Sequence, residues 1–399
     1  GIYDPRRRNI FAAEQKFDID IPYDWAKYKH ELRGEIVEGN LKIKGTIDLI
    51  LSVNDNTVEV CDWKGLPLAT KIPTPSGFTT MGELAVGDMV FDQYGKQCKV
   101  NGKSKIKFKN CYKISFDDKT SVICDDEHLW KLSDGTVKGV SELAINDKIN
   151  VTQPIECDVI DLPIDPYLLG TWLGDGSSRE CKITSSDQET FDTLESMGFE
   201  LGALDTKEGS LAITRTVYKQ TSKFRKLGLL KNKHIPEIYF RASFEQRLSL
   251  LRGLMDTDGN VNTVRKQAVF TSCNRRLSDD VKHLLLTLGQ RPNQATIYRN
   301  TNFKQDVTIY PIAFKPLNIN PFLLSRKAKR VLQEWGHGKS STRRVVRVEP
   351  TYSYQTQCIS VDSPDNTYLC TENYIPTHNT GATRKDWATG KQKEYADFQ

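Results

Sequence analysis

The sequence predicts a multi-domain protein in which an all-β domain is interrupted by an α/β insert. Three observations lead to this fold class. The chain has 399 residues, enough for about two to four domains. Hydrophobic residues make up 38% and charged residues 27%, so most of the chain can bury a core. The sequence pattern also changes from short β-like runs to helical periodicity and back again.

The elements follow in order along the chain. Residues 41–63 alternate apolar and polar side chains around the turn NDNT, which predicts a β-hairpin. From 66 to about 155, short β-like runs recur between Gly and Asp turns and predict an all-β domain. Residues 158–335 show helical periodicity with strands between, and β-like runs return after 345. A single β domain with an α/β insertion explains this sequence of patterns.

Composition restricts the class of protein. The net charge of +5 is too mild to identify a partner. Nine cysteines without a Cys-x-x-Cys pair argue against a disulfide scaffold or structural zinc and favour a reducing compartment. No run approaches the roughly 18 apolar residues of a membrane helix, and the first residues lack the layout of a secretory signal. We therefore expect a cytoplasmic monomer without a membrane partner.

Basic residues concentrate in two stretches, 215–233 and 326–347. The first contains seven Lys or Arg residues and no acid, and the second contains eight against the single Glu334. Such stretches are typical of contacts to a phosphate backbone. A solvated protein face is the alternative interpretation.

The insert contains a weak internal repeat. LLGTWLGDG (168–176) and LRGLMDTDG (251–259) are apolar runs that end in Asp-Gly, with Asp175 and Asp258 83 residues apart. Small residues four apart in each run share one helix face and allow two helices to approach closely. The pair would bring both acids together, and two close carboxylates usually hold divalent cations that can support phosphodiester cleavage. Two plain helices ending in turns are the alternative.

These two runs resemble the LAGLIDADG motifs of homing endonucleases, in their intein-borne form. The resemblance implies an α/β endonuclease domain over 156–338 with two pseudo-symmetric halves, which cleaves double-stranded DNA at a homing site with Mg²⁺. It makes Asp175 and Asp258 the metal-binding catalytic acids and Lys233 the lysine beside the active site. Lys315 is the expected counterpart of Lys233 in the other half, because the two follow their acids at nearly equal distances. A phosphate contact is the alternative role for both lysines.

The β domain resembles the HINT splicing domain of inteins. GLPLATKIPTPSGFTTMGELAVGDMVFD (65–92) reads like an intein start and CISVDSPDNTYLCTENYIPTHNT (358–380) like an intein end. The resemblance divides the splicing domain into 65–155 and 339–379, and it implies a microbial or phage origin. It implies that His128 protonates the nitrogen that leaves at the upstream junction and that the hydroxyl of Thr380 attacks the ester. Asn379 would then cyclise with the help of His378.

Three positions depart from the usual intein pattern. Gly65 stands where inteins carry Cys or Ser, so we expect a substitution that traps the unspliced precursor, because glycine cannot form the ester. Asp125 replaces the usual Thr three residues before His128, which puts its activating role in doubt. Cys358 stands where many inteins carry Asp; it could tune the junction, but we expect a buried structural cysteine.

Removal of 65–379 joins Lys64 to Thr380, and the restored segment resembles RecB-like and Cas4-like nucleases of the PD-(D/E)xK superfamily. This resemblance implies α/β host fragments at 1–64 and 380–399. Its metal site and catalytic lysine would consist of Glu14, Asp48, Asp62 and Lys64. The 84 flanking residues are few for such a nuclease, so we expect a trimmed host. Two alternatives remain: a DNA-binding intein whose endonuclease is degenerate, and a RecB-like nuclease with an inert insertion.

Overall fold

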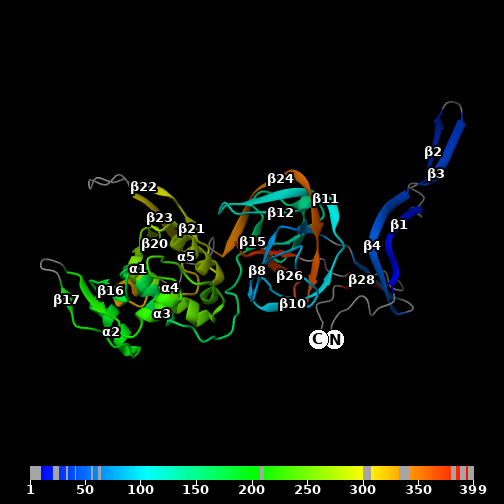
Figure 1. Ribbon diagram of the computed structural model, residues 1–399. Coiled ribbons are helices and arrows are strands. Elements are labelled where there is room, and N and C mark those ends of the chain that lie inside the picture. Colours follow the sequence, from blue (N-terminus) through cyan, green and yellow to red (C-terminus); the bar gives the residue numbers. More distant parts are fainter. Residues whose placement is uncertain are drawn as a thin grey trace.

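The computed structural model describes residues 64–206, 211–298, 307–331 and 341–378 with their side chains. In the flanking segments it describes the backbone of strands. Figure 1 shows the α/β insert and the β domain side by side, with strands β1–β4 on the far side of the β domain from the insert.

The two flanking segments contribute to one sheet. It has the strand order β1-β4-β5-β28-β29, and the hairpin predicted over 41–63 is present as β4 and β5. Strands β5 and β28 are antiparallel neighbours, with Val60 opposite Thr383, although 65–379 lies between them in sequence. The strands are β1 (Ile10–Asp20), β2 (Lys27–Leu32), β3 (Glu35–Asn40), β4 (Lys42–Asn54), β5 (Thr57–Cys61), β28 (Thr383–Asp386) and β29 (Gln392–Lys393).

The β domain is assembled from two separate stretches of chain. The long strand β24 (Thr342–Gln357) pairs with β11, β15 and β6, so the part after the insert completes the sheet begun before it. The remaining strands of the domain are β6 (Leu66–Pro67), β7 (Lys71–Thr74), β8 (Gly77–Thr80), β9 (Met89–Phe91), β10 (Gln97–Lys103), β11 (Lys107–Phe116), β12 (Ser121–Asp125), β13 (Leu129–Lys131), β14 (Val137–Gly139), β15 (Lys148–Asn150), β25 (Ile359–Val361), β26 (Thr367–Cys370) and β27 (Ile375–His378).

The insert consists of two halves, each opened by a long helix. Helix α1 (Pro166–Asp175) begins at the N-cap Asp165, whose side chain accepts from Leu168 N–H, and α4 (Phe244–Asp258) begins at a capping box of Ser243 and Gln246. The other elements are β16 (Lys182–Ser185), α2 (Gln188–Ser196), β17 (Asp205–Thr206), β18 (Ile213–Thr216), α3 (Thr221–Lys226), β19 (Gly259–Asn262), β20 (Gln267–Ser272), α5 (Arg275–Thr287), β21 (Asn293–Gln294), β22 (Ile297–Arg299), β23 (Val307–Phe314) and α6 (Ser325–Ala328).

The insert and the β domain have separate cores and share a third, smaller cluster. Phe91, Leu369 and Tyr374 of the β domain meet Leu286 of α5 in that cluster, together with Ile155 of the connecting segment. The Tyr374 hydroxyl accepts a hydrogen bond from Arg241 Nη1 at 2.9 Å and lies 2.9 Å from His283 Nε2. Residues of the insert therefore bind the side chain of Tyr374, which directly precedes β27.

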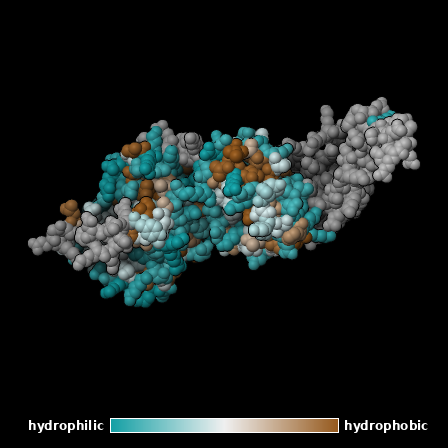
Figure 2. Space-filling view, turned by 90° about the horizontal axis from the view of Figure 1, so that it is seen from above, coloured by the Kyte–Doolittle hydropathy of each residue, from teal (hydrophilic) through white to brown (hydrophobic). Residues whose placement is uncertain are grey.

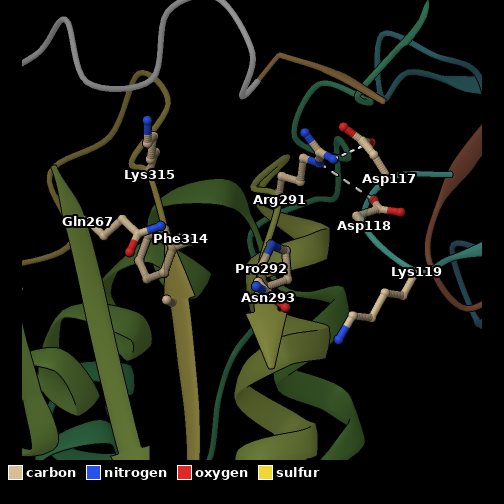
Figure 3. Close-up of a pocket in the computed structure, with 10 residues that line it drawn as sticks. Asp117, Asp118, Lys119, Gln267, Arg291, Pro292, Asn293, Phe314 and Lys315 are labelled. Carbon is tan, nitrogen blue, oxygen red and sulfur yellow. Dashed lines mark hydrogen bonds and ion pairs between the residues drawn. The ribbon is translucent and has the colours of Figure 1, made fainter. Parts of the chain in front are cut away.

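A cavity of about 240 Å³ is lined by residues of both domains (Figure 3). Arg291 of the insert pairs there with Asp117 and Asp118 of the β domain, and these ion pairs link the two domains. Within the β domain, the fully buried Arg343 donates to Asp118 at 2.8 Å. Seen from above, hydrophilic side chains dominate the surface of the insert, whereas hydrophobic ones gather over part of the β domain (Figure 2). Within the described residues, no helix is long and apolar enough to cross a membrane.

Candidate functional site

The predicted helix pair is present, and its contact is made of backbone. A Cβ on Gly170 would lie 2.3 Å from the Leu250 carbonyl oxygen, and one on Gly253 would lie 2.3 Å from the Tyr167 carbonyl oxygen. Only glycine permits such an approach, because any side chain would overlap the facing main chain. Helices α1 and α4 therefore run against each other along the small residues that the sequence identified.

The ends of the two helices match each other. Asp175 is the last residue of α1 and Asp258 the last of α4. Each is followed by a glycine whose N–H donates to the carbonyl four residues earlier, Trp172 for Gly176 and Met255 for Gly259. A Cβ on either glycine would lie within 2.4 Å of that carbonyl oxygen. The repeat found in the sequence thus corresponds to two equivalent helix ends.

The two acids are half-buried and act on each other. Burial, followed by the charge of Asp175, raises the pKa of Asp258 to about 6, while Lys233 and Lys327 lower it. Burial also raises the pKa of Asp175, against the same two lysines. Like charges held together in a poorly solvated position favour binding of a proton or a cation. This is the electrostatic signature of a cation site at the helix ends.

Two lysines lie under the helix ends, and one of them differs from the prediction. Lys233 donates to the Gly174 carbonyl of α1 at 2.9 Å, as expected for a lysine beside Asp175. Burial lowers its pKa to about 8, opposed by Asp258 and Asp175. The counterpart in the other half is Lys327 rather than Lys315. Lys315 follows β23 and lines the cavity between the domains, because the chain leaves the helix ends there (Figure 3).

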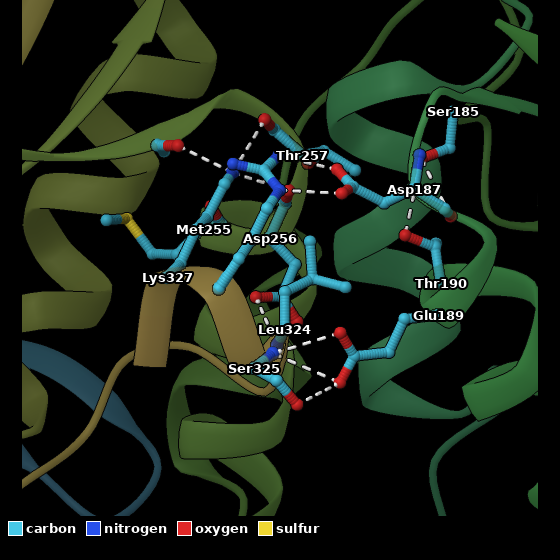
Figure 4. Close-up of polar contacts among 12 residues, drawn as sticks. Ser185, Asp187, Glu189, Thr190, Met255, Asp256, Thr257, Leu324, Ser325 and Lys327 are labelled. Atoms are coloured by element: carbon cyan, nitrogen blue, oxygen red, sulfur yellow. Dashed lines mark hydrogen bonds and ion pairs between the residues drawn. The ribbon is translucent and has the colours of Figure 1, made fainter. Parts of the chain in front are cut away.

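Lys327 lies directly beneath the end of α4. Its Nζ donates to the carbonyl oxygens of Met255, Asp256, Thr257 and Gly259 at 2.6–3.3 Å (Figure 4). These carbonyls include groups that a helix leaves without partners at its C-terminus. The ammonium therefore completes the helix end and adds positive charge below both acids. Sequence spacing alone gave no signal for it, because Lys327 is one lysine in a basic stretch.

Helix α6, which carries Lys327, is fastened to the first half of the insert. Arg326 donates through two nitrogens to the Asp187 carboxylate at 2.6 and 2.5 Å. The backbone N–H and hydroxyl of Ser325 donate to Glu189 of α2 (Figure 4). Two contacts from neighbouring residues fix the short helix against the first half, which holds Lys327 beneath the end of α4.

The donor set suits a hard divalent cation that takes part of its coordination from a substrate. Within the described residues, no group of three or more His, Cys, Asp or Glu side chains could hold a metal. Two carboxylates are nevertheless what Mg²⁺ commonly receives from a protein when phosphate oxygens and water supply the rest. The mutual repulsion of Asp175 and Asp258 gives such a cation a reason to bind.

The basic stretches serve two purposes. Several of their residues form ion pairs within the chain: Arg215 with Glu195, Lys219 with Glu200, Arg326 with Asp187 and Arg343 with Asp118. Others are exposed on or after α3, namely Lys223, Arg225, Lys226 and Lys231. The exposed set is suited to phosphate contacts. Charge counting in the sequence could not separate it from the paired set.

The upstream junction of the β domain centres on Gly65 and Asp125. The Gly65 N–H donates to Asp125 Oδ2 at 2.5 Å, and the Asp125 N–H donates to the Gly65 carbonyl at 3.0 Å. Burial raises the pKa of Asp125 to about 6, opposed by the hydrogen bond from the Gly65 N–H and by Lys109, which is 3.7 Å away. The residue whose role was doubtful from sequence therefore contacts the nitrogen of the Lys64–Gly65 peptide bond.

Gly65 fits a strand that is shaped around a glycine. A Cβ there would lie 3.0 Å from Thr356 Cβ and 3.1 Å from the Gln357 backbone. In the β24–β6 ladder Thr356 is opposite Pro67 and Gln357 is opposite Leu66. The ladder ends there; continued by one residue, the same register would place Cys358 opposite Gly65. Cys358 is buried, and its N–H donates to Ser104 Oγ at 3.0 Å.

His128 and His378 approach the same junction from the other side. The fully buried His128 contacts the Thr377 hydroxyl through Nε2, and Thr377 precedes the buried His378 in β27. Burial, and then the charge of His378, lower the pKa of His128 to about 3, while the backbone of Lys64 raises it. The structure thus brings together Gly65, Asp125, His128 and His378. Asn379, Thr380 and Asp62, and the side chains of Glu14 and Asp48, lie outside the described residues.

Part of the insert matches a known family of protein domains. Residues 245–313, which contain α4 and Asp258, match the family model of the LAGLIDADG-like domain. The second repeat therefore lies in a LAGLIDADG-like domain.

Individual relatives extend this likeness. The chain is 30% identical over 354 residues to the replicative DNA helicase DnaB of Mycobacterium intracellulare, an alignment that covers 79% of this chain and 58% of the relative. The DnaB intein splicing domain named Msm DnaB1, solved with zinc, is 13% identical with a TM-score of 0.29, over 79% of this chain and 99% of that chain. The homing endonuclease I-DmoI, solved with DNA and Mn, is 14% identical with a TM-score of 0.26, over 38% and 89%.

Proposed function

We propose that residues 65–379 are an intein that splices itself out of its host and carries a metal-dependent, site-specific double-stranded DNA endonuclease. The observation that carries the splicing proposal is the pair of hydrogen bonds between Asp125 and the backbone of Gly65. A buried acid on the nitrogen of one peptide bond, with the buried thiol of Cys358 directly after the strand that pairs with β6, is an arrangement suited to breaking that bond.

The flanking strands support an insertion. Strands β5 and β28 come from the two sides of residues 65–379 and pair within one sheet. The alignment with the mycobacterial DnaB protein covers 79% of the chain. A RecB/Cas4-like host with Asp48, Asp62 and Lys64 remains our proposal for the flanks, with a DnaB host as the alternative.

In this proposal Cys358 supplies the nucleophile that Gly65 lacks. Its sulfur attacks the Lys64 carbonyl carbon, the Lys64–Gly65 bond breaks, and the thiol proton balances the one that the Gly65 nitrogen gains. The Thr380 hydroxyl then attacks the thioester and takes over the acyl group, which regenerates the Cys358 thiol. Asn379 cyclises through its side-chain amide and releases Thr380, whose amine displaces the ester to form the Lys64–Thr380 peptide bond. The glycine is then a native feature rather than a trap.

In the endonuclease, Asp175 and Asp258 would hold Mg²⁺. When bound, the ion supplies charge stabilisation for the transition state of phosphodiester cleavage and an acidified water. Lys233 and Lys327 keep the acids ionised and add positive charge where the phosphate arrives. The exposed cations of α3 are suited to the DNA backbone. The degenerate alternative, binding without cleavage, predicts the same DNA affinity with no nicking.

Splicing is tested by mass spectrometry of the full chain after incubation in reducing buffer. We expect a 315-residue intein and an 84-residue joined host peptide. Cys358→Ala should abolish both products and leave only slow release of the 20 residues that begin at Thr380. Release that persists in Asn379→Ala would contradict the assigned downstream junction.

Cleavage is tested with DNA that carries the uninterrupted host gene, in the presence of Mg²⁺. Asp175→Asn and Asp258→Asn should abolish nicking and largely spare binding, because each removes a ligand charge and leaves the exposed cations. Glu237→Gln, an exposed acid of the same insert, is the matched control. Full activity in both Asp variants would show that another site cleaves.

A further inference from the structure

Asp125 forms hydrogen bonds with both backbone polar groups of Gly65. Its carboxylate accepts from the Gly65 N–H and its own N–H donates to the Gly65 carbonyl. The side chain is fully buried at the end of β12, and among the described residues Oδ1 has no hydrogen-bond partner. A buried carboxylate with one unsatisfied oxygen is costly in its charged form, which favours a bound proton.

His128 is poorly suited to give a proton at this junction. Its ring is buried against Trp130, and its Nε2 contacts Thr377 rather than the Gly65 nitrogen. The pKa of about 3 leaves the imidazole uncharged near neutral pH. A neutral imidazole at the Lys64 backbone is suited to hydrogen bonding with the acyl side of the bond. The nitrogen side is occupied by Asp125.

We propose that Asp125 is the catalytic acid that protonates the Gly65 nitrogen when the Lys64–Gly65 bond breaks, a role that rests on the proposed splicing. In the resting state the amide nitrogen has no basic lone pair and donates its hydrogen to Asp125. When sulfur adds to the Lys64 carbon, this nitrogen becomes tetrahedral and basic. A proton then passes from the Asp125 carboxyl to nitrogen as the C–N bond breaks. The proton lost by the Cys358 thiol restores the acid.

The surroundings of Asp125 shift its titration to about pH 6. Burial is the largest cause and raises the pKa, and Glu127 and Asp126 raise it further, whereas the hydrogen bond from the Gly65 N–H and the charge of Lys109 lower it. The titratable groups that face Asp125 come from three strands and the turn after β12: Lys109 and Cys111 of β11, Cys124 of β12, Tyr368 of β26, and Asp126 and Glu127. Lys109 pairs with Glu127 as well as with Asp125, which moderates its effect.

The test isolates the upstream step in the full chain. Asn379→Ala blocks the downstream cleavage, and saturating hydroxylamine releases residues 1–64 from the thioester or ester, which mass spectrometry quantifies between pH 5 and 8. The rate is proportional to the protonated fraction of Asp125 multiplied by the thiolate fraction of Cys358. In the Asn379→Ala parent it should therefore rise tenfold per pH unit up to about pH 6. Above pH 6 it should stay level as long as most of the thiol is protonated, because the loss of protonated Asp125 and the gain of thiolate then cancel.

Substitution of the acid changes the shape of this profile. Asp125→Asn should slow release at pH 7 by about 10²–10⁴-fold. Its rate should keep rising tenfold per unit beyond pH 6, because only the thiolate then titrates. Lys109→Met removes the charge that lowers the pKa of Asp125, so the break should move to higher pH and the plateau rate should increase. A purely structural role would move neither the break nor the slope. Asp134→Asn, which removes an exposed acid of the same domain that does not act on Asp125, is the matched control.

The possible failures can be distinguished. If Cys358→Ala abolishes release while Asp125→Asn keeps the parental rate and the break near pH 6, the role of Asp125 is refuted and the splicing proposal stands. If Cys358→Ala releases 1–64 at the parental rate, the proposed nucleophile is wrong. Folding of the Asp125→Asn chain is checked with Asn379 retained, by the slow release of the peptide that begins at Thr380. A folded, inactive Asp125→Asn chain that Asp125→Glu rescues in part supports the proposal.

Discussion

Gly170 of α1 and Gly253 of α4 face each other so closely that a Cβ on Gly170 would lie 3.0 Å from the Gly253 Cα. Gly253→Ala should therefore push the helices apart and lower the free energy of unfolding of the insert by about 3 kcal/mol. The displaced acids should also reduce DNA cleavage. Urea denaturation of both proteins measures the first effect. Gly139→Ala is the control, because its Cβ would meet nothing nearer than 3.7 Å; equal losses in both variants would contradict the argument.

The acid pair makes the stability of the insert depend on pH and metal. Because the folded pKa of Asp258 is raised to about 6 from an unfolded value of about 3.9, its protonated form favours the folded state. Without metal, the stability that this group contributes is complete below pH 4 and is lost as the pH rises to 6, by at most about 3 kcal/mol. Mg²⁺ should restore it at pH 7. Thermal melts at pH 4.5 and 7, with EDTA or Mg²⁺, measure this difference.

Removal of one acid should change the pKa of the other. In Asp175→Asn the pKa of Asp258 should fall, since the charge of Asp175 is one of the two causes that raise it. NMR titration of the carboxyl carbon reports the shift directly. Glu237→Gln, which removes an exposed acid that does not act on Asp258, should leave the pKa of Asp258 close to its present value. An unchanged pKa in Asp175→Asn would mean that the two carboxylates are not electrostatically coupled.

Lys327 and Lys315 should respond differently to the same substitution. Lys327→Met removes an ammonium that serves four carbonyl oxygens at the end of α4, so both the stability of the insert and the cleavage rate at saturating DNA should drop. Lys315→Met should change the cleavage rate less than twofold. Single-turnover kinetics with excess protein separates these outcomes, and equal loss in the two variants would favour the lysine expected from sequence spacing.

Substitutions at Gly65 distinguish two explanations of the upstream junction. If glycine is a trap, the unmodified chain is inert and Gly65→Cys gains splicing, as the intein pattern predicts. If Cys358 is the nucleophile, the unmodified chain splices. Gly65→Ala should then slow the upstream step about tenfold, because its Cβ crowds Thr356 and Gln357. The proportion of joined 84-residue product, measured by mass spectrometry for the three proteins, distinguishes the accounts.

The hydroxyl of Tyr374 connects the insert to the downstream junction. Tyr374→Phe leaves Arg241 Nη1 and His283 Nε2 without that partner, which should cost about 1–3 kcal/mol. Because Tyr374 directly precedes β27, which ends at His378, release of the peptide after Asn379 should also slow. Tyr354→Phe, in the β24 strand away from this contact, is the control for the loss of a hydroxyl.

The sequence by itself determined the local features of this protein. Helix periodicity, small residues four apart and the Asp-Gly endings defined α1 and α4 and the acids at their ends, because these signals repeat within one or two turns. Alternating β-like runs on both sides of the insert likewise predicted a β domain in two parts. In each case neighbouring residues carry the information.

Only the tertiary structure decided which distant groups meet. Asp125 reaches the Gly65 nitrogen across 60 residues, and Lys327 rather than Lys315 lies beneath Asp258 because Arg326 and Ser325 fasten α6 to the other half of the insert. Arg343, which reads as a surface cation in a basic stretch, is buried against Asp118. Spacing along the chain has no bearing on such contacts. They depend on how strands and helices far apart in sequence are packed, and on the desolvation that this packing imposes on each charge.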